Sequence, residues 1–305
     1  MKKVKHTTCS ITKAVLALTA CASLNAFAGP AGKVEKPADA DDSLFGTFGI
    51  PITGSVDVGW DSRYYFRGLW FADQITWSGI SLSMPLSMIS ENLTLGVGAL
   101  YTSTVETIVG GGVPAGTPGN LLDYSELDLT ASLTYDFKFM KLGVVYTNYQ
   151  FFDGFSGTLN NGAAFGLGEY AVKSVPEIGV VASTSQFGVN AYLGYYYDFN
   201  IGGSYFEVGA DYPVKVLPYL TFVPAVKAGY GLDYYSNGAP ENGGLFGGVT
   251  SGFTHVLFSL GAPVNLTKTA TLTPYVAWNV SGRARQSNNL TDNEVFGGVK
   301  LSVSF

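Results

Sequence analysis

Hydrophobic and polar residues alternate one by one along much of the chain, most regularly at its end. Residues 294–305 read EVFGGVKLSVSF, with valine, leucine and the terminal Phe305 on one face and mainly polar residues or glycine on the other. Side chains of a β-strand point alternately to its two sides. This period-two pattern therefore predicts a strand with one apolar face, as in the closing strand of a membrane barrel.

Eleven further segments show a similar alternation. In the clearest of them, Leu127, Leu129 and Leu133 share one face, while Asp128 and Thr130 share the other. Such a pattern excludes an amphipathic helix, which would repeat every 3.6 residues. The twelve expected strands are 55–67, 75–84, 93–103, 124–135, 139–151, 174–183, 189–198, 204–212, 220–233, 253–262, 271–281 and 294–305.

The connections between these segments are alternately long and short. Residues 104–123, 152–173, 234–252 and 282–293 form long links, whereas 68–74 and 199–203 would be brief links at the same end. Bacterial barrels have short periplasmic turns and longer external loops. The sequence therefore predicts an all-β, up-and-down antiparallel transmembrane β-barrel of 12 strands over residues 55–305. Ten or fourteen strands are the alternatives, because the second and sixth segments alternate least clearly.

The first 28 residues resemble a secretory signal peptide. Lysines precede an apolar stretch that ends at Ala26-Phe27-Ala28, so cleavage is expected near Ala28. The alternative is lipidation of Cys21, because Leu18-Thr19-Ala20-Cys21 resembles a lipobox. Residues 29–54 lack a hydrophobic period and are rich in alanine, glycine, proline and aspartate, which predicts a flexible periplasmic tail.

Removal of residues 1–28 changes both the cysteine content and the charge. Both cysteines, Cys9 and Cys21, lie in this segment, so the mature chain would hold no disulfide and no thiolate metal site. The segment also contains four of the 17 basic residues and none of the 23 acidic residues, which leaves a net charge of −10. This balance argues against a nucleic-acid partner, and no motif indicates a cofactor.

One short motif resembles a known family. Residues 62–68 read SRYYFRG and follow VDVGW at 56–60. The motif resembles the S-x-Y-x-F-R-G signature in the opening strand of the TorF-type family of outer-membrane porins, over about fourteen residues. The resemblance implies a small barrel of the porin class, without a defined substrate.

Alternation also predicts which side chains face the lumen of the barrel. Charged residues must point inward, because arginine on the lipid face costs roughly 2–4 kcal/mol at the membrane midplane. The candidates for lining or constricting a pore are Asp57, Asp61, Arg63, Arg67, Glu126, Asp128, Lys141, Glu177, Glu207, Asp211, Lys227 and Lys300. Arg63 and Arg67 would either select ions at a constriction or form ion pairs that seal the first strand against the last, with Arg67 near Glu294.

Two further expectations concern aromatic residues and histidine. The alternation places Tyr64 and Phe66 on the lipid face, in an interfacial girdle with other aromatic residues. After signal cleavage His255 is the one histidine left, so a lipid hydrolase of the Ser-His type would depend on it. Its expected inward orientation, with Leu257 where a serine would be needed, argues against such an enzyme.

These observations favour a narrow channel for small hydrophilic solutes in the outer membrane of a Gram-negative bacterium. Because inward acids outnumber inward bases, a mild cation preference is expected. The expected partners are outer-membrane lipids, small solutes and the barrel-assembly machinery, which would bind the final strand ending in Phe305. The alternatives are a non-conducting structural or adhesive barrel that binds partners through its external loops, and a soluble secreted β-sandwich.

Overall fold

The computed structural model describes residues 52–105, 125–152, 156–158, 164–166, 174–200, 202–234, 251–282 and 293–305. The expected signal peptide, both cysteines and almost all of the expected periplasmic tail lie outside these residues. Within the described part, the chain is built from strands joined by turns. No helix in this part is long and apolar enough to cross a membrane.

Twelve long strands form the body of the molecule. They are β1 (Thr53–Phe66), β2 (Leu69–Pro85), β3 (Leu93–Thr104), β4 (Ser125–Asp136), β5 (Lys141–Phe151), β8 (Ser174–Gln186), β9 (Val189–Asp198), β10 (Gly203–Asp211), β12 (Leu220–Leu232), β13 (Gly252–Gly261), β15 (Ala270–Ser281) and β16 (Asn293–Ser304). Short strands β11 (Val214–Leu217) and β14 (Val264–Asn265) extend the same sheet, and β6 (Ser156–Thr158) pairs with β7 (Ala164–Gly166) in a separate small sheet.

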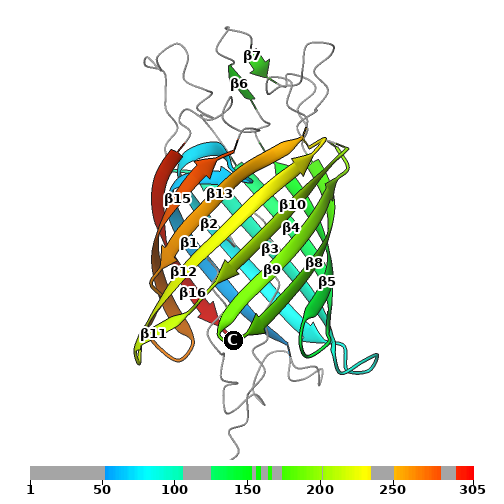
Figure 1. The fold of residues 1–305 in the computed structure, drawn as a ribbon, viewed down its shortest axis with the longest axis vertical. Helices are drawn as coiled ribbons and strands as arrows, with labels where there is room; N and C mark the ends of the chain where they lie inside the picture. The colour runs from blue at the N-terminus through cyan, green and yellow to red at the C-terminus, as the bar shows by residue number, and fades with distance from the viewer. Residues whose placement is uncertain are drawn as a thin grey trace, which may run out of the picture.

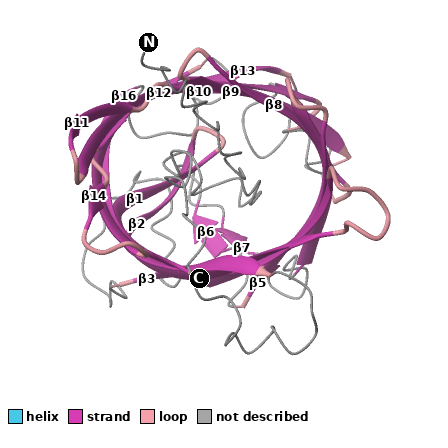
Figure 2. Cartoon of the chain, turned by 90° about the horizontal axis from the view of Figure 1, so that it is seen from below, coloured by secondary structure: helices cyan, strands magenta, loops and turns pink. Residues whose placement is uncertain are grey.

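The long strands make one closed antiparallel sheet. Each pairs with its neighbours along the chain, and the ring closes because β1 pairs with β16 from Ser55↔Ser304 to Asp61↔Gly298. Figure 1 shows the strands running obliquely around the wall, and Figure 2 shows the closed ring along its axis. The prediction of a 12-stranded, up-and-down barrel is confirmed, and the alternatives of ten and fourteen strands are wrong.

The outer face of the barrel is apolar. In β4, Leu129 and Leu133 are 39% and 45% exposed on the outside, whereas Glu126 and Asp128 of the same strand are buried on the inside. Phe305 is also exposed on the outer face. A soluble protein would cover such a continuous apolar surface, and a β-sandwich would pack two sheets face to face. The alternative of a soluble sandwich is therefore wrong, and the barrel is of the transmembrane type.

The two ends of the barrel differ. At one end, here called the terminal end, Gly54 and Phe305 are joined by two backbone hydrogen bonds. The connections at this end are short, such as the turn at Phe187-Gly188 between β8 and β9. At the opposite end, here called the loop end, β3 and β4 are joined by a long link, as are β12 and β13. The small sheet of β6 and β7 lies beyond the wall at the loop end (Figure 1).

One connection at the loop end differs from the prediction. Residues 68–74 were expected to form a brief link, but β2 begins at Leu69 and pairs with β1 up to Phe66↔Leu69. Arg67 and Gly68 alone form the turn, with φ angles of 50° and 80°. Positive φ at both central residues is the geometry of a two-residue hairpin turn that fits the twist of its strands. The first two strands therefore continue as a hairpin beyond the point where the link was expected.

Candidate functional site in the barrel lumen

The outer part of the β1–β2 hairpin leaves the barrel wall. Pairing of β1 with β16 ends at Asp61↔Gly298, and pairing of β2 with β3 begins only at Ile75↔Thr104. Residues 62–74, here called the inner hairpin, are therefore paired with one another in place of the neighbouring wall strands. At its base, Gln74 still accepts a backbone hydrogen bond from Val105, and the Ser62 hydroxyl accepts one from Gly297. Viewed along the axis in Figure 2, β1 and β2 reach into the interior of the ring.

The inner hairpin is packed against the lumen side of the wall on both of its faces. On one face, Tyr64 is buried with Leu100 of β3, and its hydroxyl donates a hydrogen bond of 3.2 Å to Glu126 of β4. On the other face, the ring of Tyr65 stacks on Phe296 of β16 with centroids 5.1 Å apart. The hairpin therefore contacts the wall strands that flank it on both sides.

This arrangement corrects the expectation that Tyr64 and Phe66 face lipid. Tyr64 is buried, and Phe66 packs edge-on against the lumen-facing Tyr149, with ring centroids 5.7 Å apart. Alternation separates lipid from lumen only while a strand remains in the wall. The register shifts at Tyr64/Tyr65, and such an irregularity bends a strand. Beyond it, both faces of the hairpin lie inside the barrel.

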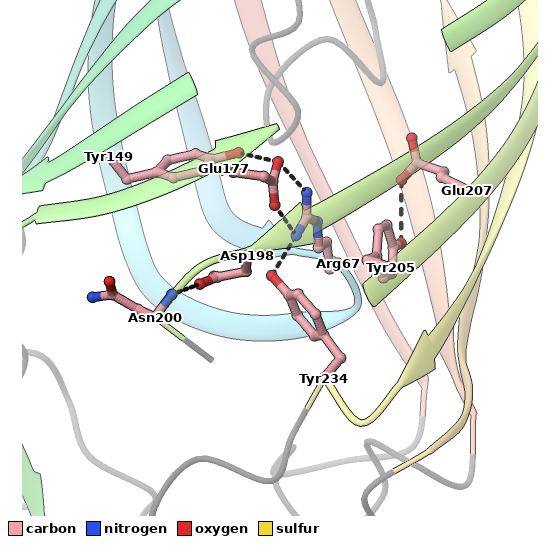
Figure 3. Close-up of polar contacts among 8 residues, drawn as sticks. All are labelled: Arg67, Tyr149, Glu177, Asp198, Asn200, Tyr205, Glu207 and Tyr234. Carbon is pink, nitrogen blue, oxygen red and sulfur yellow. Dashed lines mark hydrogen bonds and ion pairs between the residues drawn. The ribbon is translucent and has the colours of Figure 1, made fainter. Parts of the chain in front are cut away.

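Arg67 stands at the tip of the inner hairpin and is bound by the far wall. Its side chain is 1% exposed, and it makes a two-pronged ion pair with Glu177 of β8, with N–O distances of 2.7 and 2.8 Å. Its Nη1 also donates to the hydroxyl of Tyr234, just beyond β12 (Figure 3). Tyr149 of β5 donates to Glu177 over 3.3 Å. The tip is therefore tied to β8 and to a residue just beyond β12, and Tyr149 of β5 supports Glu177.

Aromatic rings surround the same guanidinium. Its central carbon lies 4.4 Å from the ring centroid of Tyr205, 4.7 Å from Phe66, and 5.1 Å from both Tyr196 and Tyr234. A cation over an aromatic face is attracted by the quadrupole of the ring, and most strongly where water is excluded. A charged group this deeply buried is tolerated only if paired and hydrogen-bonded, and the surroundings of Arg67 meet both conditions.

The second turn residue, Gly68, lies against His255 of β13. A Cβ atom at Gly68 would lie 2.7 Å from the Cβ of His255 and 2.8 Å from its Nδ1. His255 is itself buried, and its Nδ1 is 2.9 Å from the hydroxyl of Thr254. The histidine thus faces the lumen beneath the hairpin, away from the lipid, and Leu257 is buried in the lumen beside Tyr65.

Gly68→Ala is expected to release the tip of the inner hairpin. The methyl group would collide with His255, and an L-residue at φ 80° is strained by about 1–2 kcal/mol. The measurement is trypsin cleavage after Arg67 in the folded, micelle-bound barrel, because buried Arg67 is protected in the wild type. Gly202→Ala is the matched control, since Gly202 has a similar φ of 71° and nothing within 4 Å of the added atom. Equal cleavage of both variants would contradict this role of Gly68.

Acidic side chains gather near the bound Arg67. Asp128 of β4 lies opposite Tyr149 of β5, and Glu177 of β8 lies opposite Thr147, one lumen-facing position further along β5. Glu126 and Asp128 are buried on the same face of β4. One oxygen of Asp128 has no hydrogen-bond partner in the described part of the chain. The wall near the hairpin tip is therefore rich in carboxylates.

A second lumen network lies beside the first. Glu207 of β10 accepts a hydrogen bond of 2.6 Å from Tyr192 and one of 3.3 Å from Tyr205, and it lies 3.4 Å from the ammonium of Lys227 on β12. Tyr205 belongs to both networks, since its ring also packs on Arg67 (Figure 3). These contacts fix the orientation of Tyr205, which is one of the residues around Arg67 that together are here called the arginine site.

Asp61 marks the point where the hairpin departs from the wall. Its carboxylate is buried and accepts hydrogen bonds from the indole of Trp77 on β2, over 3.0 Å, and from the hydroxyl of Tyr275 on β15. These bonds join three strands across the seam between the two ends of the sheet. Asp61 therefore anchors the base of the inner hairpin.

The remaining predicted residues line the wall with partial exposure. Lys300 of β16 lies 4.0 Å from Asp57 of β1, and Ser302 also donates to Asp57. Asp211 accepts from Asn190 over 2.7 Å, and Lys141 stands at the start of β5. These residues lie nearer the terminal end, whereas Arg67, Glu126, Asp128 and Glu177 meet toward the loop end.

The expected contact between Arg67 and Glu294 is wrong. Arg63 makes the ion pair with Glu294, and it also lies 3.4 Å from Asp73 across the hairpin. Arg67 lies beyond the bend and reaches Glu177 instead. Ion pairs do join the first strand to the last, but through Arg63 and Asp57.

Sequence reasoning missed the tyrosines that form the arginine site. Tyr205 is two positions from Glu207 on β10, and Tyr149 is eight positions from Lys141 on β5. Because residues an even number of positions apart share one face of a strand, alternation would have placed both tyrosines in the lumen. No pattern could place Tyr234, because it follows the end of β12. The described residues contain no cluster of three or more His, Cys, Asp or Glu side chains that could hold a metal ion.

No family model and no curated protein matches this sequence. Solved structures with a similar fold include an outer-membrane channel from Pseudomonas putida F1, at 13% identity over 83% of this chain and 95% of that chain, with a TM-score of 0.47. The KdgM porin in complex with oligogalacturonate matches at 11% identity over 82% and 99% of the two chains, with a TM-score of 0.45. LpxR from Salmonella typhimurium matches at 8% identity over 82% and 99%, with a TM-score of 0.44. The barrel architecture itself rests on the strand pairing described above.

Proposed function

We propose that this protein is a channel of the Gram-negative outer membrane that passes small hydrophilic solutes and prefers cations. The carrying observation is the charge of the inner wall. Five lumen-facing carboxylates outnumber the three bases Arg67, Lys227 and Lys300 that pair with some of them; the carboxylates are those of Asp57, Glu126, Asp128, Glu177 and Glu207. Rings of carboxylates lower the barrier for cations entering a pore.

The orientation follows from the two ends of the barrel. The terminal end, with its short turns, would face the periplasm, and the loop end, with its long links, would face the exterior. The final strand β16 would present Phe305 to the barrel-assembly machinery, and the apolar outer face would contact outer-membrane lipids. The motif at residues 62–68 adds to this proposal through its resemblance to TorF-type porins.

A non-conducting barrel that binds partners through its external loops is the second candidate. The observation that favours it is the inner hairpin, whose tip is buried inside the barrel. In the channel proposal, the described state is the closed one, and conduction requires that the hairpin move. The two candidates therefore differ in whether current can be measured.

We expect a cation-selective current in planar bilayers. With potassium chloride in unequal concentrations on the two sides, the reversal potential should have the sign set by potassium, because the lumen carboxylates attract cations. The double variant Glu126→Gln/Asp128→Asn should move the reversal potential toward zero. A potential with the sign set by chloride would refute the cation preference. Absence of current, both in the wild type and in a variant with a released hairpin, would favour the non-conducting barrel.

A further inference from the structure

The receptor for Arg67 belongs mainly to the barrel wall and not to the hairpin that occupies it. Glu177 is on β8, Tyr196 on β9 and Tyr205 on β10, and Tyr234 follows β12. Of the four rings around the guanidinium, Phe66 alone comes from the inner hairpin. Withdrawal of the hairpin would therefore leave a carboxylate flanked by three tyrosines on the lumen wall.

Contacts that do not involve the hairpin hold this receptor in shape. Tyr149 donates to Glu177, and the ring of Tyr205 packs on those of Tyr196 and Tyr234, with centroid distances of 6.4 and 5.6 Å. The hydroxyl end of Tyr205 also lies against Gly229 of β12, where a Cβ atom would be 2.1 Å from the hydroxyl oxygen. A site whose groups are held by their own neighbours is organised before its ligand arrives.

The geometry of the receptor suits a guanidinium better than an ammonium. Both oxygens of Glu177 are used by two nitrogens of one planar fork, and Tyr234 accepts from one of them. A guanidinium can form such paired bonds and stack on aromatic faces at once, whereas an ammonium is a strongly hydrated point charge. The site therefore discriminates by shape as well as by charge.

Beyond its base, the hairpin that fills the receptor is joined to the wall strands on either side by side-chain contacts and not by a strand ladder. Its strand pairing is internal from Arg63↔Asp73 to Phe66↔Leu69, and the wall strands end their pairing at its base. Withdrawal of the residues beyond Arg63 would break the Arg67 contacts, the hydrogen bond from Tyr64 to Glu126 and the packing of Tyr64 and Tyr65, but no ladder of the barrel wall. Moving the hairpin is thus compatible with an intact barrel.

From these observations we infer that the wall around Glu177 is a guanidinium-binding site of the transport path. Arg67 occupies this site in the closed state, and a solute that carries a guanidinium group competes for it and favours the open state. The inference rests on the proposed channel function and adds the class of solute. A ligand that binds one state better than another shifts the population toward that state.

Binding can be tested without conduction. In micelles, Arg67→Ala should bind methylguanidinium saturably. Methylammonium should bind at least about tenfold more weakly, because it cannot form the two-pronged bond to Glu177. The double variant Arg67→Ala/Glu177→Gln should bind methylguanidinium at least about tenfold more weakly than Arg67→Ala does. The double variant Arg67→Ala/Asp211→Asn should keep the affinity of Arg67→Ala. Isothermal titration calorimetry gives the affinities, and heat-dependent electrophoretic mobility shows that each barrel is folded. Equal affinity for the two probes, or no loss in the Glu177→Gln background, would overturn the inference.

The wild type gives a test that needs no altered arginine. Methylguanidinium added to one side of a planar bilayer should increase the fraction of time that the wild-type barrel is open, and equimolar methylammonium should not. Asp211→Asn should respond like the wild type, and Glu177→Gln should lose the response. If the wild-type channel conducts and responds equally to both probes, the guanidinium site is refuted while the channel stands. If binding follows the expected order but no current is ever seen, the channel is refuted while the site stands.

Discussion

Arg67→Ala is expected to open the lumen and to raise the open fraction of the barrel at least about tenfold. Removing one partner of a buried ion pair typically costs 3–5 kcal/mol, because the other charge is left uncompensated. Here the barrel can avoid that cost if the hairpin withdraws and water reaches Glu177, which is 2% exposed in the closed state. Each 1.4 kcal/mol is a factor of ten in an equilibrium, so a cost of this size shifts the population at least about tenfold toward the open state. The measurement is the single-channel open probability in planar bilayers.

Arg63→Ala is the matched control for this experiment. Arg63 is on the same hairpin and also pairs with carboxylates, but its side chain is 33% exposed and its partners lie at the base of the hairpin. Partly exposed ion pairs contribute little, typically below about 1 kcal/mol. The control should therefore remain mostly closed. An open probability that is the same in both variants would show that the bond from Arg67 across the lumen does not hold the hairpin.

Leu129→Arg is expected to destabilise the barrel in lipid by roughly 2–4 kcal/mol, because it places a charge on the hydrocarbon side. Leu129 lies in the middle of β4 and is 39% exposed on the outer face. The free energy of unfolding can be measured by reversible urea titration in lipid vesicles. This result would test directly which face of the sheet contacts the membrane.

The neighbouring residue supplies the control for Leu129→Arg. Thr130 faces the lumen between Gly98 of β3 and Thr147 of β5. An arginine there can extend into the interior, so Thr130→Arg should change the free energy of unfolding much less. If the lumen variant were destabilised as strongly as the lipid-facing one, the assignment of the two faces would be in error.

The inner hairpin also explains why one charged motif serves two structural roles. Arg63, near the bend, joins β1 to β16 through Glu294, and Arg67, at the tip, crosses the lumen to Glu177. The three residues between them carry the chain from the wall to the interior. In the channel proposal, the first role belongs to the permanent wall and the second to its closed state.

Alternation along the sequence was sufficient to predict the barrel. A strand in the wall has lipid on one side and the lumen on the other, so each residue must suit one of two environments, and the pattern records that choice. The expected segment 124–135 corresponds to Ser125–Asp136, and the expected segment 294–305 to Asn293–Ser304. The inward orientation of Glu126, Asp128 and Glu177 follows from the same local rule, since each is buried on the lumen side.

The sequence contains a sign that the rule stops at the hairpin. Tyr64-Tyr65-Phe66 is a run of aromatic residues without alternation just before the turn. A two-faced wall strand would not have such a run, whereas a strand packed on both faces inside the barrel can. The expected lipid-facing positions of Tyr64 and Phe66 were wrong because the alternation was extended past its physical basis.

The sequence by itself determined the number of strands, their approximate bounds and the apolar outer face, because these depend on local environment. Only the tertiary structure decided where the hairpin points and which carboxylate Arg67 binds. Arg67 and Glu177 are separated by 110 residues, and their meeting depends on the bend at Tyr64/Tyr65 and on the width of the closed ring. Those are properties of the whole sheet, and no pattern of neighbouring residues records them.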